Sequence, residues 1–377
     1  MTEVESPLLL AHLGKINDPR IDRTKDHLLI DILTIAVCAS ICGADSWTEM
    51  EEFGEAKEAW FRSFLTLPNG IPSHDTFRRV FMLIKPTEFQ QVFLAWVKEV
   101  AKEVGAEVVS VDGKLLRGSR TRQARKDAKE GLRIVSAWAS ENSLVLGQVK
   151  THEKSNEITA IPELLRVLEL KGGIVTIDAM GCQTQIAEHI IEQEADYVLA
   201  LKGNQGCLHK DVEDYFYGAQ KIGFKQIAYS FTETVEKGHG RIETRRLWTT
   251  EDVEWLSQKE KWAGLKSIVM VESIREIIGQ VASVERRYFI SSLAADAKET
   301  LREVRGHWGI ENQLHWVLDV AFREDHCQIK DANAAENMAT LRHFVLNLLK
   351  QEKSCKRGMK TKRLKAGWNE SYLLKVT

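Results

Sequence analysis

The sequence predicts an α/β fold in which helices flank a mixed sheet, a β-rich stretch interrupts it, and an all-helical part precedes it. Three observations support this prediction. Apolar residues recur at helical spacing between residues 8 and 100, and no strand pattern interrupts them. From Glu107 onward short β-rich runs appear, and the later runs alternate with helical stretches. The chain then returns to β-rich runs over residues 226–292 and to helices over residues 298–350.

The N-terminal helices are predicted most clearly over residues 28–42 and 89–100, where apolar positions have helical spacing. A shorter helix is expected to follow the N-cap residue Ser73, with Arg78 and Arg79 on its exposed side. The second helix of a helix-turn-helix has this form, and so does any capped surface helix. The sequence leaves both interpretations open.

Five short β-rich runs are expected to form the main sheet: EVVSVDG, LRIVSAWAS, SLVLGQVK, GGIVTIDA and DYVLALKG. Helices are predicted between the later runs, over residues 157–170, 183–194 and 207–216. A hairpin is predicted in the second β-rich stretch, with its turn at residues 237–240. The basic stretch after residue 350 is expected to be mobile.

Composition restricts the class of protein. The 377 residues are 44% hydrophobic and carry a net charge of −2, so a nucleic-acid partner cannot be argued from total charge. Bases are concentrated at residues 114–129 and 350–365, which solvated loops would also explain. Six scattered cysteines show no zinc-site spacing. Without a long apolar run or a secretory pattern, we expect a cytoplasmic protein with no membrane partner.

Two β-rich runs end in the same way. Strand alternation places Ser110 and Asp112 on one face of the first run, and Thr176 and Asp178 on one face of the other. Ends of buried strands are where α/β sheets place ligand groups. If the strands are neighbours, the two carboxylates repel each other unless a proton or a cation lies between them. A single strand-end aspartate often caps the next turn, but the matched pair favours a shared cation.

Glu311 is the third candidate acid. Helical spacing places it on an apolar stripe with Leu301, Val304, Trp308, Leu314 and Leu318. A carboxylate on such a stripe needs a partner, which would be a metal ion, a hydrogen-bond network or a base such as Arg302 or Arg305. Gly309 predicts that this helix bends or that it begins near Glu311.

Three carboxylates at one point suit the in-line cleavage of a phosphodiester. This reaction uses one divalent ion at the attacking oxygen and a second at the leaving oxygen, about 3.5–4 Å apart. Hard carboxylate oxygens suit Mg²⁺ or Mn²⁺. Asp112 would bridge the two ions, and Asp178 and Glu311 would each complete one. The same centre can use water to nick DNA and then a DNA 3′-hydroxyl to attack a new strand, because only the nucleophile changes.

Four ordered blocks carry a family resemblance: VDGKLLRGS, TIDAMGCQ, YVLALKGNQ and HWGIENQLHWVLDVAFREDHC. Over nearly its whole length the chain resembles the ISAs1 family of insertion-sequence transposases, which includes the H-repeat-associated proteins, within the wider IS4-like group. The resemblance implies an RNase H-like core whose DDE triad is Asp112, Asp178 and Glu311, with two divalent ions, Mg²⁺ or Mn²⁺. It implies double-stranded DNA as partner, both element ends and target. We expect a homo-oligomer in the DNA complex, which would bring the protein to the nucleoid.

The resemblance also divides the chain. The expected parts are a helical domain that recognises element ends (1–100), the first part of the catalytic core (101–225), a β-rich insertion (226–295), a helical part carrying Glu311 (296–350) and a basic tail (351–377). The wider group has a tyrosine, an arginine and a lysine around its last acid. This chain has Val304, His307 and Leu318 there, which leaves open which groups position the DNA phosphate.

Several side chains near the acids are candidates for DNA contact, although structural roles would explain each of them equally. They are Lys114, Arg117, Lys202, Asn204, Arg305 and His307. His239 and Arg241, in the predicted turn, are added to them. Contacts from such groups to backbone phosphates would make the affinity fall steeply with salt.

The predicted function is therefore a DDE-type transposase that cuts element ends and transfers them into target DNA. A metal-dependent nuclease without strand transfer would need the same acids. A DNA-binding relic that has lost catalysis is the third possibility, and the presence of all three carboxylates weighs against it.

Overall fold

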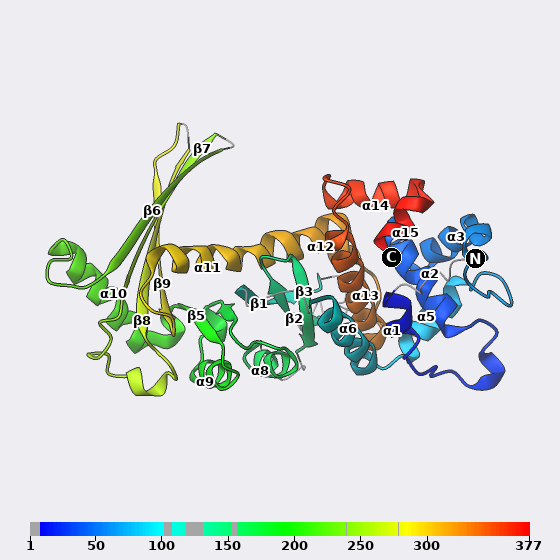
Figure 1. The fold of residues 1–377 in the computed structure, drawn as a ribbon, viewed down its shortest axis with the longest axis horizontal. Coiled ribbons are helices and arrows are strands. Elements are labelled where there is room, and N and C mark those ends of the chain that lie inside the picture. The colour runs from blue at the N-terminus through cyan, green and yellow to red at the C-terminus, as the bar shows by residue number, and fades with distance from the viewer. Residues whose placement is uncertain (1–7, 102–107, 118–130, 152–156, 239, 278) are drawn as a thin grey trace.

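The molecule is elongated, with a helical body at one end and a projecting sheet at the other (Figure 1). The computed structural model describes residues 8–101, 108–117, 131–151, 157–238, 240–277 and 279–377. Helix α11 (Ala297–Gly309) runs along the molecule between the two ends. The first described helix and the C-terminus both lie in the helical body.

A nine-stranded sheet has the strand order β3-β2-β1-β4-β5-β9-β8-β7-β6. β1 (Val108–Leu115) is antiparallel to β2 (Arg133–Ala139) and parallel to β4 (Ile174–Ile177). The other strands are β3 (Leu144–Lys150), β5 (Asp196–Leu201), β6 (Ser230–Gly238), β7 (Arg241–Thr250), β8 (Ser267–Ile277) and β9 (Ser283–Ser291). This arrangement confirms the predicted α/β class, a mixed sheet flanked by helices.

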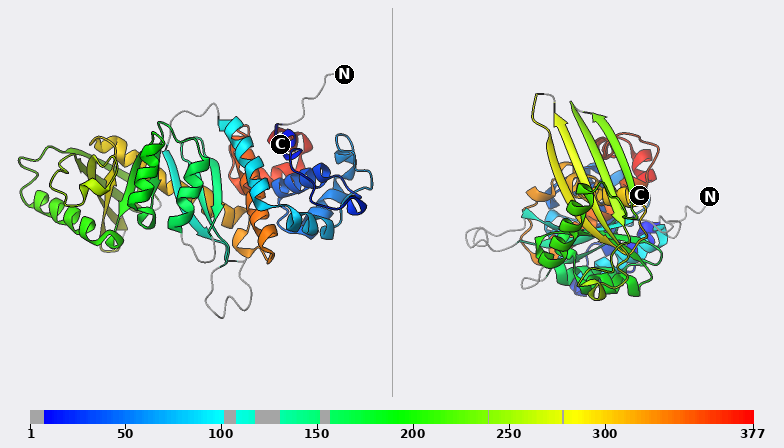
Figure 2. Two further views of the ribbon diagram at one scale, coloured as in Figure 1. Left: turned by 90° about the horizontal axis from the view of Figure 1, so that it is seen from below. Right: turned by 90° about the vertical axis from the view of Figure 1, so that its left-hand side faces the viewer.

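The predicted β-rich insertion is continuous with the core sheet and does not form a sheet of its own. β9 pairs with β5 in antiparallel register, with Leu199 opposite Ile290. β6 and β7 form the predicted hairpin and pair as far as Gly238 and Arg241. His239 in its turn lies outside the described residues. The ends of these strands project beyond the rest of the fold (Figure 2).

Helices cover both faces of the sheet. On one face lie α8 (Glu157–Val167), α9 (Thr184–Glu192) and α10 (Gly206–Lys221). α11 packs on the other face, where Val198 of β5 is buried with Leu301 and Val304. α11 continues through a π-helical turn, η7 (Ile310–His315), into α12 (Trp316–Ala321). α11, η7 and α12 therefore form one continuous helix that connects the sheet to the helical body.

The N-terminal part is helical, as predicted, but it shares its core with the C-terminal end of the chain. Its helices are α1 (Leu8–Leu13), α2 (Leu29–Cys42), α3 (Trp47–Ala56), α4 (Glu58–Phe61), α5 (His74–Leu83) and α6 (Pro86–Val100). α13 (Ala332–Gln351) packs against α2, α5 and α6. Its Phe344 lies between the rings of Phe89 and Phe93. The N-terminal helices thus use α13 to bury their apolar faces.

The expectation of a mobile basic tail is wrong. Residues after 350 form α14 (Met359–Trp368) and α15 (Glu370–Val376). Lys362 Nζ donates to the carbonyl of Leu349 at 2.7 Å, and Arg363 Nη2 donates to the carbonyl of Ser40 at 2.8 Å. These carbonyls belong to the last turns of α13 and α2, which lack partners within their own helices. The basic residues are ordered because they satisfy helix C-termini.

In the described part of the chain, no single helix is long and apolar enough to cross a membrane. α2 and α3 reach that length only when taken together, across a bend of 95°.

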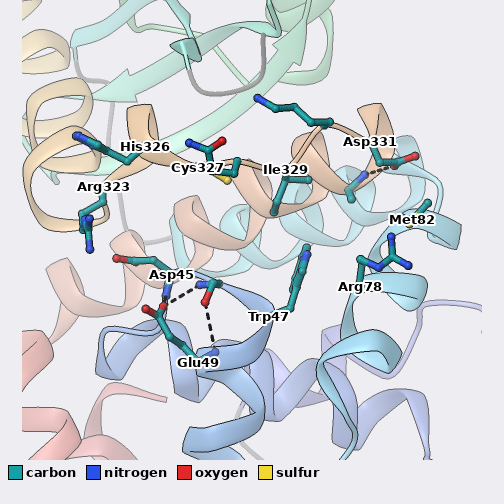
Figure 3. Close-up of a pocket in the computed structure, with 14 residues that line it drawn as sticks. Asp45, Trp47, Glu49, Arg78, Met82, Arg323, His326, Cys327, Ile329 and Asp331 are labelled. Atoms are coloured by element: carbon teal, nitrogen blue, oxygen red, sulfur yellow. Dashed lines mark hydrogen bonds between the residues drawn. The ribbon is translucent and has the colours of Figure 1, made fainter. Parts of the chain in front are cut away.

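A pocket opens where the N-terminal helices meet the segment that precedes α13 (Figure 3). Trp47 and Met82 line one side of it, and Cys327 and Ile329 line the other. Arg78, which was predicted to be exposed, is half-exposed at the edge of this pocket. The predicted carboxylate trio lies elsewhere, at the sheet.

Asn347 of α13 supplies hydrogen bonds to the edge strand β3. Its Oδ1 accepts from the Val145 N–H at 2.8 Å, and its Nδ2 donates to the Val145 carbonyl at 2.9 Å. We expect Asn347→Ala to lower the free energy of unfolding by about 1–3 kcal/mol, because buried backbone groups lose their partners. Urea unfolding measures the change. Asn333→Ala, at an exposed amide on the same helix, should stay within about 0.5 kcal/mol of wild type. Equal losses in both variants would contradict this.

Candidate active site

The ends of β1 and β4 bring Asp112 and Asp178 together. The two strands are parallel, and Val111 is paired with Ile177. Asp112 and Asp178 are the next residues on their strands, so they leave the paired region at the same level. Neighbouring strand ends of this kind form the ligand-binding side of α/β sheets.

Both aspartates are directed towards α11 by the alternation of side chains along the strands. The residues two positions earlier, Ser110 and Thr176, face this helix. Thr176 Oγ1 donates to Ser110 Oγ at 3.1 Å, and Ser110 Oγ donates to the carbonyl of Gly306 in α11 at 3.3 Å. A chain of hydroxyl groups therefore fixes the distance between the helix and the two strands.

Gly309 permits this close approach, and Glu311 does not begin a new helix. The backbone of Gly309 is helical, with φ −59° and ψ −40°, and the helix continues beyond it. A Cβ atom on Gly309 would lie 3.2 Å from Trp138 Nε1 in β2. The helix therefore needs a residue without a side chain at this position.

Glu311 lies in the π turn and is exposed, so its predicted place on a buried apolar stripe is wrong. The other predicted stripe positions are buried at Leu301, Val304, Leu314 and Leu318, whereas Trp308 is 40% exposed. A π turn contains more residues than an α turn, which shifts the faces of the helix relative to α-helical spacing. The carboxylate of Glu311 is therefore open to solvent and to a ligand.

His307 has all three predicted acids around it. Its Nδ1 lies 3.1 Å from Thr176 Oγ1. Burial lowers the pKa of His307, and the negative charges of Asp112, Asp178 and Glu311 oppose this shift. The charges of acids from three distant parts of the sequence therefore all reach this imidazole.

His315, at the end of the π turn, was not singled out in the sequence. Its Nδ1 lies 3.4 Å from Asp112 Oδ2. It is four residues beyond Glu311, in the same family block, and this spacing is the only sequence signal that could have identified it. His315 thus holds Asp112 from the helix side.

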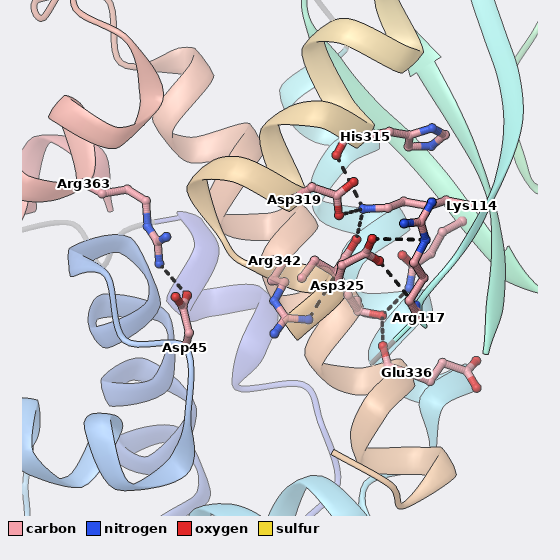
Figure 4. Close-up of polar contacts among 12 residues, drawn as sticks. Asp45, Lys114, Arg117, His315, Asp319, Asp325, Glu336, Arg342 and Arg363 are labelled. Carbon is pink, nitrogen blue, oxygen red and sulfur yellow. Dashed lines mark hydrogen bonds and ion pairs between the residues drawn. The ribbon is translucent and has the colours of Figure 1, made fainter. Parts of the chain in front are cut away.

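Lys114 was a candidate for DNA contact, and the structure places it in a buried ion cluster instead (Figure 4). Its Nζ donates to Asp319 Oδ1 at 2.5 Å and to Glu324 Oε2 at 2.7 Å. Burial alone would lower the pKa of Lys114, but the two carboxylates outweigh it and raise the pKa. Its charge is already matched, so Lys114 joins β1 to α12 rather than facing a phosphate.

Two of the other basic candidates are open to solvent. The Arg117 side chain is 79% exposed, and its Nε lies 3.5 Å from Asp325 Oδ2 (Figure 4). Lys202 is exposed at the start of η5 (Gly203–Gln205). Asn204 Nδ2 donates to the carbonyl of Ala179 at 2.6 Å, so this side chain supports the loop that follows Asp178.

The two arginines near the projecting strands already have partners. Arg305 Nη2 lies 2.5 Å from Glu236 Oε1, and Arg241 Nε lies 2.7 Å from Glu243 Oε1. Both side chains are about half-exposed, so a phosphate could reach them only in competition with glutamate.

The sequence matches two family models. One, described as "Transposase DDE domain", covers residues 103–348, and the other, described as "DDE_Tnp_1-associated", covers residues 10–97. The chain belongs to the DDE transposase family. The first match includes every candidate acid, and the second covers most of the helices that precede the sheet.

Named relatives of this DDE transposase support the family assignment. The chain is 43% identical over 371 residues to "Putative transposase YncI" of Escherichia coli O157:H7, covering 98% of this chain and 94% of that one. It is 40% identical over 378 residues to "H repeat-associated putative transposase YhhI" of Escherichia coli strain K12, covering 99% and 98%. A cryo-EM structure of a piggyBac transposase synaptic complex with hairpin DNA is similar at TM-score 0.45 and 13% identity, over 97% of this chain and 78% of that one. The predicted resemblance to H-repeat-associated proteins is confirmed.

DDE transposases imply divalent metal ions, and the donor chemistry here fits them. Carboxylate oxygens are the ligands that Mg²⁺ and Mn²⁺ prefer. Asp178 Oδ1 accepts from the N–H groups of Met180 and Gly181, at 3.0 and 3.3 Å, so this aspartate also caps η4 (Ala179–Gly181). Within the described ranges, no three His, Cys, Asp or Glu side chains are close enough to hold an ion. The carboxylates of Asp112, Asp178 and Glu311 are suitable ligands, but their oxygens do not lie in coordinating positions.

A fourth carboxylate, Glu157 at the start of α8, was not singled out in the sequence. It is buried, and its Oε1 lies 2.5 Å from Arg133 Nη1. Glu157 begins a predicted helix and carries no local signal that sets it apart from other helix-start acids.

Proposed function

We propose that this DDE transposase cleaves phosphodiester bonds at the ends of an insertion element and joins the freed ends to target DNA. Asp112, Asp178 and Glu311 are its catalytic acids. The observation that carries the proposal is the gathering of these three acids around His307, at the ends of two parallel strands. Family membership supports the class of reaction, and the positions of the acids support the choice of residues.

The protein groups position the acids. The N–H groups of Met180 and Gly181 hold Asp178, and His315 holds Asp112. Two divalent ions, Mg²⁺ or Mn²⁺, bound to the three carboxylates would activate the attacking oxygen and stabilise the leaving oxygen. Glu311, on the π turn, reaches the site from the helix side.

Double-stranded DNA would bind along the side of the sheet where the acids lie. Arg117 and Lys202 are exposed there and are our first choices for contact with phosphates. Arg305 and Arg241 would exchange glutamate for phosphate on binding. We assign the recognition of element ends to the N-terminal helices, and expect a homo-oligomer in the DNA complex and a cytoplasmic, nucleoid-bound location.

The test is incubation of the purified protein with Mg²⁺ and labelled DNA that carries the inverted repeats flanking the gene. We expect cut ends and products in which those ends are joined to a target plasmid. Cleavage without joining would replace the proposal with a metal-dependent nuclease. DNA binding with neither product would favour a catalytically silent relic.

A further inference from the structure

Glu157 lies close to both aspartates of the proposed site. It is only 6% exposed, although carboxylates are seldom buried so completely without a reason. Burial raises its pKa, Arg133 lowers it, and the charges of Asp112 and Asp178 raise it further. The charges of both aspartates therefore reach this fourth carboxylate.

Gly113 makes room for Glu157. A Cβ atom placed on Gly113 would overlap the carboxyl group of Glu157. The glycine that follows Asp112 in the VDGK block therefore has a steric role: it lets a carboxylate from α8 lie directly against β1.

Among the residues that the structure describes, the charges around this point do not balance. Arg133 provides one positive charge, against Glu157, Asp112 and Asp178, with the exposed Glu311 beside them. Lys114 does not neutralise these carboxylates, because its ammonium group already binds Asp319 and Glu324. Buried like charges repel strongly unless a cation compensates them. A divalent cation is the natural counter-charge for such a cluster.

We propose that Glu157 is a fourth carboxylate of the divalent-metal site, held in place by Arg133 and admitted by Gly113. The inference rests on the proposed function, because it concerns the same site. It adds a residue from α8, on the opposite side of the sheet from Glu311, so the metal site would be enclosed by helices from both faces.

Binding of Mn²⁺ to the purified full-length protein, without DNA, tests this proposal. We expect Glu157→Gln to weaken Mn²⁺ binding by about 10-fold or more, measured by calorimetry and by the EPR signal of free Mn²⁺. Glu303→Gln is the matched control. Glu303 is also a buried glutamate paired with an arginine, Arg302, but none of the site acids acts on it. This variant should bind Mn²⁺ as wild type does.

A second variant keeps the charge and moves it. Gly113→Ala should displace the Glu157 carboxylate and weaken Mn²⁺ binding while Glu157 itself is unchanged. If circular dichroism shows that Glu157→Gln does not fold, the Mn²⁺ affinity of Gly113→Ala tests the proposal in its place. Wild-type Mn²⁺ affinity in Gly113→Ala and in folded Glu157→Gln overturns the proposal for Glu157.

Asp112→Asn separates this inference from the proposed function. If it loses Mn²⁺ binding while Glu157→Gln retains it, the metal site stands with three acids and the inference fails. If Asp112→Asn also binds Mn²⁺ as wild type does, the proposed metal site itself is overturned.

Discussion

Replacing any one of Asp112, Asp178 or Glu311 by its amide is expected to reduce DNA cleavage and strand transfer to the background level, while DNA binding is retained. The amide keeps the shape of the side chain but removes the negative charge that binds a divalent ion. The basic surface is untouched, so the affinity for DNA should change little. Labelled DNA in Mg²⁺ measures both chemical steps, and fluorescence anisotropy measures binding.

Asp331→Asn is the control for these three variants. Asp331 caps the N-terminus of α13, where asparagine is an equally good cap, so activity should be unchanged. Glu311→Gln is the most informative member of the set, because Glu311 is exposed on the π turn, away from the two strand ends. Full cleavage by Glu311→Gln would remove this residue from the trio and leave the two aspartates.

Lys114→Met should lower the free energy of unfolding by about 3–5 kcal/mol, because it leaves Glu324 buried without its main counter-charge. The Glu324 side chain is only 2% exposed, and the remaining cation, Arg342, is 3.8 Å away from it. Guanidinium unfolding measures the loss. Arg117→Ala, three residues later and just beyond the end of β1, is 79% exposed, breaks only a surface pair and should cost about 0–1 kcal/mol.

The effect of Lys114→Met should depend on pH. Burial alone would raise the pKa of Glu324, but Lys114 and Arg342 outweigh it and lower the pKa below the ordinary value of 4.5. A lowered pKa stabilises the fold above pH 4.5, and this contribution is lost as the pH falls through the folded-state value. The stability difference between wild type and Lys114→Met should therefore shrink in acid. A difference that stays constant from neutral to acidic pH would show that Lys114 does not act through Glu324.

Local patterns were sufficient to predict the fold class and the position of two candidate acids at the ends of strands. Alternation along two apolar runs predicted that Asp112 and Asp178 end buried strands, and the register of β1 and β4 shows that these strands are neighbours. The helical N-terminal part followed from apolar spacing in the same way. These predictions hold because side-chain direction in a strand or helix depends only on nearby residues.

The predicted burial of the last acid was wrong where the local geometry of the helix changed. An α-helical spacing placed Glu311 on a buried stripe, but Glu311 lies in a π turn and is exposed, although Leu314 and Leu318 of the same stripe are buried. No sequence pattern marked that turn. The π turn follows Gly309, where the helix lies against Trp138 of the sheet. Packing against the sheet therefore accompanies the change in helical geometry.

By itself, the sequence determined the elements, the strand ends that carry two carboxylates, and the family. Only the tertiary structure decided which charges meet. Lys114 binds Asp319 and Glu324, which are 205 and 210 residues away along the chain, and Glu157 reaches the site because Gly113 leaves space for it. Electrostatic and steric contacts depend on distance in space, and sequence spacing reports that distance only within a single helix or strand.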